Sequence, residues 1–471
     1  MQEPSLVVRE QLALAHSAEA VKATSGPLEA SFPPRVEALQ SAWVETWGKL
    51  GLQNDKDAFH GDALGGHTST CHVSASTKQR THAGEAFLAS VADRPNLTII
   101  TGALVEAVDF AEREGKRTAT GVRYTKGGKT LHIVARKKVI LAAGTFLSPA
   151  LLERSGIGDS QHLSTLGVPL NYHNAAVGEN LQDHIRGSIS FEAADDAPLP
   201  IPIPDEEARK MYERDRSGPW GERLARAFSY MPLPPLLNDE SQVHLDKVLN
   251  GVGQPAASGD FTAKHRSFVK AQISDPAGST ATAFLTRRPA IPPAGSAQQP
   301  SSGAVQAPTR WISLEAMLSH PLSRGSVHIT SPSSQEKPTI RANYYSDPTD
   351  LEVHALVLKA LTKVAATPPL SDFIKRDGEH APADSSLDGL KAHLKKYTGT
   401  NYHPTGTCSM LPEEFGGVVD SRLKVYGTEN LHVVDASVMP VVPRCNIITT
   451  VYAIAERAAD MLAEDLGLIV K

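Results

Sequence analysis

The sequence predicts an α/β fold in which buried strands run directly into helix starts. Residues 138–144 (KVILAAG) form an apolar segment that ends in small residues. Ser148 and Pro149 then suit the N-cap and the first position of the following helix. A second apolar strand, residues 431–437, ends in a carboxylate ahead of a final helix over about residues 446–466. Strands that feed helix starts in this way are how α/β folds approach a nucleotide or flavin.

Length and composition indicate a soluble globular protein. The chain has 471 residues, 41% of them hydrophobic and 21% charged, which is enough for about three average domains or two large ones. A net charge of −5 gives no reason to expect nucleic acid or an anionic membrane as a partner. No apolar run approaches the roughly 20 residues of a membrane span, and the opening residues lack a secretory signal. We therefore expect a small-molecule partner and, by default, a cytoplasmic location.

The N-terminal part of the chain predicts helix followed by loop. An amphipathic stretch over residues 36–50 ends before Gly51, which suits a helix C-terminus. Residues 60–82 are rich in Gly, His, Ser and Thr and are expected to form an extended loop.

This expected loop carries four potential zinc ligands, His60, His67, Cys71 and His72. Their spacing matches no regular ligand pattern. No metal site is predicted.

A regular pattern precedes the strand at residue 138. A short helix is expected over residues 85–91, and residues 96–100 are expected to form a strand that continues through 101–108. Residues 121–135 predict a β-hairpin around Gly127-Gly128.

The middle of the chain is less regular. Pro-rich segments within residues 186–310 alternate with short amphipathic helices such as 206–216. A strand is then expected at residues 323–329, a strongly periodic helix at 350–364 and a basic helix at 389–396.

Two blocks carry a resemblance to a known family. Residues 144–158 read GTFLSPALLERSGIG, and residues 177–184 read VGENLQDH. The first matches throughout the second signature of the glucose–methanol–choline (GMC) flavoprotein oxidoreductases, and the second resembles that family's next block. The resemblance implies an α/β fold with a discontinuous FAD-binding domain and an α+β substrate-binding domain built on an antiparallel sheet.

The resemblance also implies domain boundaries. An N-terminal helical segment would cover residues 1–60, and the substrate-binding domain would cover residues 186–395. The FAD-binding domain would comprise residues 61–185 and, with the catalytic residues, 396–471.

His403 is the candidate catalytic base. It lies in the turn-forming sequence NYHPTGT at residues 401–407, and a neutral imidazole can accept the proton of a substrate hydroxyl near pH 7. The GMC pattern has its catalytic His in a His-Pro-x-Gly-Thr context, which His403 matches. The family's second position, His or Asn, falls about forty residues on and lands on Asn446. Asn446 would hold the substrate oxygen, and it could also cap the last helix.

The resemblance assigns further contacts to FAD. Val105 matches a valine whose backbone touches the adenine, although a buried strand residue would need no such role. Asp435 and Ala436 match the pair beside the ribityl-pyrophosphate region. Ile447 and Ile448 match positions whose amides meet the flavin pyrimidine edge, where a helix N-terminus favours the negative charge of reduced flavin.

One family feature is not found in the opening residues. GMC proteins begin with a strand, a Gly-x-Gly-x-x-Gly turn and a helix, and neither Ser25-Gly26 nor Gly65-Gly66 supplies this turn. Three interpretations stay open: a truncated form of an ordinary FAD enzyme, a chain that binds FAD together with a partner, or a non-catalytic, ligand-binding relative.

The expected activity is FAD-dependent oxidation of an alcohol, with proton abstraction by His403 and hydride transfer to flavin N5. The Pro-rich middle region resembles that of fungal members that act on aromatic or secondary-metabolite alcohols. The alternative is a remnant or ligand-binding protein without activity.

Overall fold

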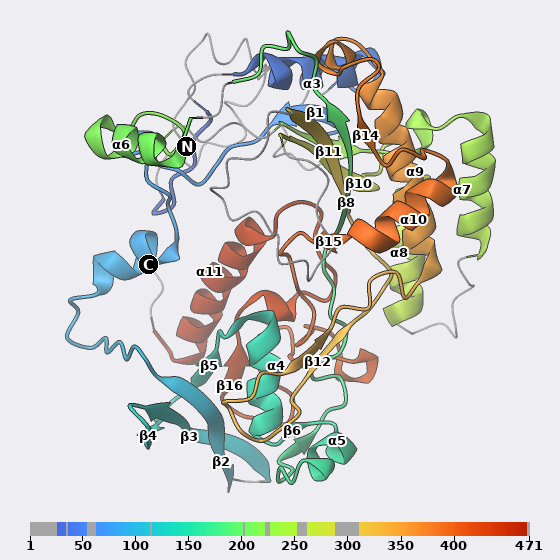
Figure 1. Cartoon of the computed structure of the whole chain (residues 1–471). Coiled ribbons are helices and arrows are strands. Elements are labelled where there is room, and N and C mark those ends of the chain that lie inside the picture. The colour runs from blue at the N-terminus through green and yellow to red at the C-terminus, as the bar shows by residue number, and fades with distance from the viewer. Residues whose placement is uncertain are drawn as a thin grey trace.

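A computed structural model describes residues 26–33, 36–53, 63–113, 115–200, 203–221, 227–251, 261–287 and 310–468. Figure 1 shows two stacked parts, with a large sheet and its helices above and a small three-stranded sheet below. Helix α11 (Ile448–Asp465) lies between them. Among the described residues, no helix is long and apolar enough to cross a bilayer.

The upper part is built on a seven-stranded antiparallel sheet, which confirms the predicted α+β substrate-binding architecture. Its strands follow the order β1-β9-β10-β11-β8-β14, and β15 also pairs with β8. Their bounds are β1 Gly65–Thr68, β8 Ile185–Glu192, β9 Ala227–Met231, β10 Ala281–Thr286, β11 Trp311–Leu318, β14 His380–Ala381 and β15 Gly399–Thr400.

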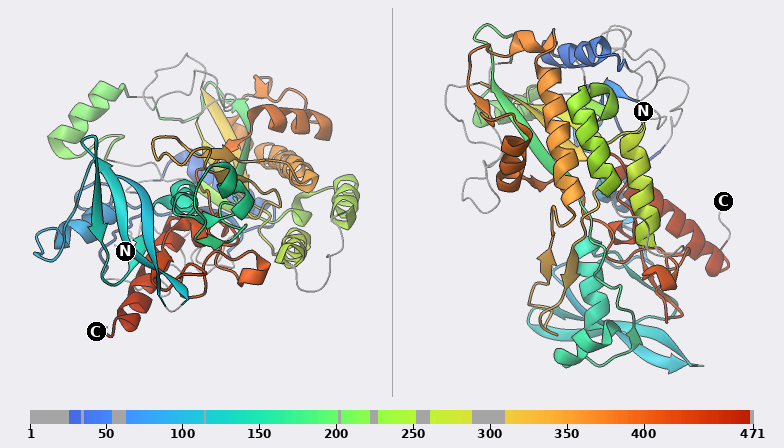
Figure 2. Two further views of the ribbon diagram at one scale, coloured as in Figure 1. Left: turned by 90° about the horizontal axis from the view of Figure 1, so that it is seen from below. Right: turned by 90° about the vertical axis from the view of Figure 1, so that its right-hand side faces the viewer.

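Helices cover one face of this sheet. Along the strands, small and aliphatic side chains that point toward the helices alternate with side chains that point to the opposite face. On β11, Ile312, Leu314 and Ala316 are buried in the same apolar core as residues of α9 (Pro348–Ala365). Figures 1 and 2 show α9 beside the helices α7 (Asp239–Gly251), α8 (Phe261–Ser274) and α10 (Leu387–Tyr397). Helix α3 (Ala38–Lys49) adds Trp43 and Trp47 to this core.

The lower part combines an antiparallel sheet with a parallel strand pair. Strands β2 (Leu104–Arg113), β3 (Lys116–Lys126) and β4 (Lys129–Val134) form the antiparallel sheet, and the predicted turn at Gly127-Gly128 has positive φ at both residues. Strands β5 (Val139–Leu141) and β16 (Leu431–Val433) are parallel. Their carboxyl ends therefore lie at the same edge, as the sequence led us to expect for a nucleotide-binding α/β fold.

Shorter elements complete the described chain. They are η2 Gly84–Leu88, η3 Ala89–Val91, α4 Gly144–Arg154, β6 Ile157–Gly158, α5 Ser160–Thr165, β7 Tyr172–His173, α6 Asp205–Asp215, η4 Pro234–Leu236, β12 Ser326–His328, β13 Thr339–Arg341, η5 Leu370–Phe373, η6 Glu413–Phe415 and η7 Ala436–Val438.

Helix α4 begins five residues earlier than the Ser148-Pro149 pair implied. Its first residue is Gly144, and Pro149 lies inside the helix. Ser148 is therefore not an N-cap. Its buried hydroxyl accepts a hydrogen bond from the Ala143 N–H (3.1 Å) and donates one to Asp435 Oδ2 (2.5 Å).

Two predictions about strands are wrong: one predicted strand does not form, and one observed strand was predicted to be a loop. Residues 96–100 form no strand, and Ile99 is 50% exposed, because no described strand lies alongside to pair with them. Conversely, part of the expected loop at 60–82 is the buried strand β1, which pairs with β9. The glycines of β1 are typical of a loop in the sequence. Gly66 is needed in this strand because it lies against α3, where a larger side chain would not fit.

The close contact at Gly66 predicts a stability effect. A Cβ on Gly66 would lie 2.8 Å from Trp47 Cδ1 and 3.0 Å from Val44 Cα, so Gly66→Ala should destabilise the fold by about 1–3 kcal/mol through overpacking. Gly26→Ala is the control, because a Cβ there meets nothing within 4 Å. Urea unfolding should show a lower midpoint for Gly66→Ala only. Equal midpoints for the two variants would contradict this packing argument.

Candidate active site

One segment, residues 180–184, joins two distant parts of the chain. The backbone of Gln182 pairs with Thr405 through bonds of 3.0 and 2.9 Å. Its side-chain amide donates to the carbonyl of Pro440 (2.9 Å), and its Oε1 accepts from the N–H of Val442 (3.2 Å). Gln182 therefore fixes the segment that carries His403 relative to the segment that leads to Asn446.

His403 is buried, with 8% of its surface exposed. Its backbone N–H donates to Asp183 Oδ1 (3.0 Å). Its ring Nδ1 lies 2.8 Å from Nδ1 of His184, and the two rings meet edge to face. Burial lowers the pKa of His403 to about 4 and, together with the nearby His403 and His320, that of His184 to about 3. Both imidazoles are therefore neutral near pH 7.

The partner of His184 assigns the protons of this pair. His184 Nε2 lies 3.2 Å from the carbonyl oxygen of Ser319, which can only accept. The proton of neutral His184 is thus on Nε2, and its Nδ1 must accept from His403. His403 then carries its own proton on Nδ1, and its Nε2 keeps a free lone pair. The Asn401 amide, 3.3 Å from His403 Nδ1, can turn its oxygen toward the same N–H.

Sequence reasoning singled out His403 but assigned no role to His184. The signal was present, since His184 closes the VGENLQDH block. Its role depends on a contact across 219 sequence positions, which no local pattern reveals.

Asn446 does not cap α11, which corrects one of its two expected roles. The N-cap is Ile447, and the helix has no side-chain cap. The side chain of Asn446 is exposed and makes no hydrogen bond with another described residue. Ile447 is 9% exposed and packs with Met439 and Val442, whereas Ile448 is 38% exposed. The first N–H groups of α11 are thus left without a side-chain acceptor.

Asp435 lies at the carboxyl end of the parallel strand pair. Its Oδ2 accepts from the Gly144 N–H (2.9 Å) and from Ser148, while its Oδ1 accepts from Ser437. This carboxylate ties the start of α4 to β16, and Ala436 follows it at the start of η7. Gly144 has φ +81°, and a Cβ there would meet nothing within 4 Å, so the strand ends border open space.

Val105 lies elsewhere, on β2, where it is partly buried against the lower apolar core. Its packing accounts for the residue type without a ligand. An irregularity in the β2–β3 register follows it, between Val105 and Ala107.

The face of the large sheet opposite the helices is directed toward the candidate site. Asn401 Nδ2 lies 2.9 Å from the sulfur of Met317 on β11. The Arg444 guanidinium lies 4.2 Å from the ring centre of Tyr230 on β9. Phe228 and Phe284 form an aromatic pair beside Tyr230 on this face. This face thus carries a group of aromatic side chains, which contacts the segment leading to Asn446 through Arg444.

Of the four potential zinc ligands near the N-terminus, three lie within the described residues. His60 lies outside the described residues. His67 is buried against Phe228 and Tyr230, and no metal-type grouping within the described ranges includes His67, Cys71 or His72.

A parallel strand pair with an open carboxyl edge and an uncapped helix start are features with which α/β folds bind a nucleotide or flavin. Sequence comparison supports this: family models described as GMC oxidoreductase match residues 9–186 and 321–455. The chain belongs to the GMC oxidoreductase family, whose members are FAD-dependent, and its cofactor is FAD.

Individual relatives agree with this assignment. The GMC oxidoreductase family protein Mala s 12 of Malassezia sympodialis is 31% identical over 468 residues, covering 98% of this chain and 71% of the relative. Patulin synthase of Penicillium expansum is 29% identical over 443 residues, covering 92% and 65%. The structure of an FAD-dependent oxidoreductase from Chaetomium thermophilum shares the fold, with a TM-score of 0.82, 24% identity and coverage of 99% and 78%.

The neutral buried histidines predict how stability depends on pH. Burial lowers the pKa of His320, like those of His184 and His403, well below the 6.5 of an unfolded chain. Between pH 6.5 and 4 the unfolded state therefore binds more protons, so stability falls as pH falls. We expect a loss of roughly 1–2 kcal/mol per buried imidazole at pH 5.

Urea midpoints at pH 7 and pH 5, at constant ionic strength, measure this loss. His320→Gln removes one buried imidazole and should make the decrease smaller. An equal decrease in wild type and His320→Gln would contradict a neutral, buried imidazole at position 320.

Proposed function

We propose that this chain oxidises an alcohol, with His403 as the base that takes the hydroxyl proton. Bound FAD would supply the acceptor, at N5, for the hydride of the carbinol carbon. Loss of one proton and one hydride converts the alcohol into a carbonyl compound, so the step is balanced. The proton is transferred to Nε2 of His403.

The observation that carries this proposal is the Ser319–His184–His403 series of hydrogen bonds. It leaves the unprotonated Nε2 as the free nitrogen of His403, and no hydrogen bond within the described residues involves that atom. A base needs its lone pair directed at the substrate, and a single tautomer provides this without reorganisation. His184 is then a positioning residue.

Several groups would hold the flavin. Asp435, Ala436 and Gly144 lie where the parallel strands end, and ligands of α/β folds bind at that edge. The amides of Ile447 and Ile448 at the uncapped start of α11 favour negative charge. Val105 would contact the adenine through its backbone.

Asn446 would orient the substrate. An amide can donate to the hydroxyl oxygen but cannot take its proton, so the base role remains with His403. The exposed side chain of Asn446 is available for this contact.

Aromatic alcohols fit the neighbouring surface best. Tyr230 and Phe228 have partly buried rings on the sheet face directed toward the site, and aromatic pairs gain about 0.5–1.5 kcal/mol beyond burial. We expect a role in secondary metabolism, because the fungal relatives include one named patulin synthase.

Replacing His403 tests the base. In His403→Ala, anaerobic reduction of bound FAD by a panel of primary aryl alcohols should slow by about 10²–10⁴-fold, the usual contribution of a positioned base. The readout is loss of flavin absorbance in stopped flow. Tyr402→Phe is the matched control, because Tyr402 is next to His403 in the chain and is 69% exposed.

Flavin content must be equal in wild type and variant for this comparison. Unchanged flavin reduction in His403→Ala at equal FAD content would rule out His403 as the base. Reduction by no alcohol of the panel in the FAD-loaded wild type would count against alcohol oxidation itself.

Replacing His184 tests the tautomer assignment. His184→Leu removes the acceptor for His403 Nδ1–H, and kcat should fall on the order of 10–100-fold, because losing the fixed tautomer removes part of the ~10²–10⁴-fold contribution of a positioned base. His184→Gln keeps an acceptor oxygen and should retain most of the activity.

A purely structural role for His184 would give a different pattern. It would lower FAD content and thermal stability in proportion to activity. If His184 fixes the tautomer of His403, the Leu variant should instead lose kcat with little change in KM, and the Gln variant should recover kcat. Equal kcat in the Leu and Gln variants would contradict it.

A further inference from the structure

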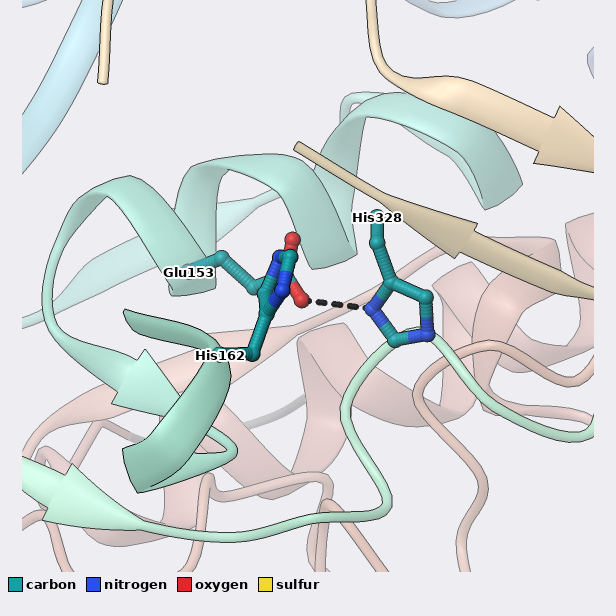
Figure 3. A group of neighbouring side chains, drawn as sticks. All are labelled: Glu153, His162 and His328. Carbon is teal, nitrogen blue, oxygen red and sulfur yellow. Dashed lines mark hydrogen bonds and ion pairs between the residues drawn. The ribbon is translucent and has the colours of Figure 1, made fainter. Parts of the chain in front are cut away.

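A second group of titratable side chains lies away from the candidate active site. Glu153 is in the last turn of α4, His162 is on α5 and His328 ends β12. One possible ligand atom from each residue lies within 4.8 Å of the others. Figure 3 shows the three side chains pointing toward one another.

We propose that Glu153, His162 and His328 bind one divalent transition-metal ion, with Zn²⁺ the best fit. Two imidazoles and one carboxylate form a donor set that Zn²⁺ accepts readily. The sequence predicted no metal because these ligands come from three separate segments rather than from a regular spacing.

Each member of the group already has the outer partner that a metal ligand requires. His328 Nε2 lies 3.0 Å from Glu179 Oε1, and His162 Nε2 lies 3.0 Å from the carbonyl oxygen of Ile329. Glu153 Oε2 accepts from the N–H of Ile329 (2.8 Å). Metal-bound histidines almost always donate their second ring N–H to a carboxylate or carbonyl.

These outer contacts determine which atoms remain for the ion. With both Nε2 atoms donating, the Nδ1 atoms of His162 and His328 carry the lone pairs, and Oε1 of Glu153 is the remaining carboxylate oxygen. A water molecule would complete four-coordination.

Only small movements are needed to admit the ion. Glu153 Oε1 and His328 Nδ1 are 2.7 Å apart, as in a hydrogen bond, whereas zinc ligands at ~2.0–2.1 Å from the ion stand roughly 3.3 Å apart. Glu153 is fully buried, but the side chain of His328 is 25% exposed and can shift.

When no metal is bound, the hydrogen bond between His328 Nδ1 and Glu153 Oε1 holds the two side chains together at this position. The ion would connect α4, α5 and β12, and its effect is expected on stability rather than on turnover.

The experiment uses the FAD-loaded protein, stripped of metals with a chelator and then titrated with ZnCl₂. Calorimetry should give one zinc more per wild-type chain than per His162→Asn or His328→Gln chain. Zinc should also raise the wild-type Tm in a concentration-dependent manner, since a ligand of the folded state stabilises it. His380→Gln, which alters an exposed His outside the group, should behave like wild type.

His162→Asn is the decisive variant. It leaves the Glu153–His328 pair intact and changes only a partly buried side chain, so it should fold. Equal zinc uptake and an equal Tm shift in wild type and His162→Asn would overturn the proposal, as would the absence of uptake by wild type. Because alcohol-driven flavin reduction should be the same with and without zinc, this outcome is independent of that of His403→Ala.

Discussion

The hydrogen bonds of Gln182 are the constraint on which the candidate site depends. Its amide holds Pro440 and Val442 while its backbone pairs with Thr405, and the residue is only 1% exposed. Leaving a buried polar group of this kind without its partner costs about 1–3 kcal/mol. Separation of the segment that carries His403 from the segment that leads to Asn446 is therefore unfavourable. Asp183 and His184 follow directly in the chain, and their contacts with His403 are therefore set by the same tie.

The fold was predictable wherever local pattern and tertiary pairing agree. The hairpin at Gly127-Gly128 and the long helix α9 follow from turn chemistry and apolar period alone. Strand β1 was missed because its partner β9 lies about 160 positions away and its glycines resemble a loop. Residues 96–100 show the reverse, since an apolar, β-branched run becomes a strand only where another strand meets it.

The candidate site was predictable to the extent that single residues occur in distinctive contexts. His403 and Asp435 were proposed because their local sequences match the GMC pattern, and the structure places them in a buried turn and at a strand end. Ser148 was misassigned because a Ser-Pro pair suits a helix start, yet its hydroxyl bonds to a carboxylate 287 positions away. The pairing of His184 with His403 is of the same kind. What sequence cannot supply is the partner of a buried polar atom.

The environments of His403 and His328 differ in which atoms of the histidine the nearby carboxylates contact. Asp183 lies against His403, but it accepts the backbone N–H and the Tyr344 hydroxyl rather than a ring N–H. Burial therefore acts on the imidazole alone and keeps it neutral. At His328, Glu153 and Glu179 contact both ring nitrogens and hold the proton there. A carboxylate on the ring of His403 would likewise favour its cation, and a protonated ring has no lone pair for a substrate proton. The backbone contact of Asp183 thus positions His403 without removing its capacity to act as a base.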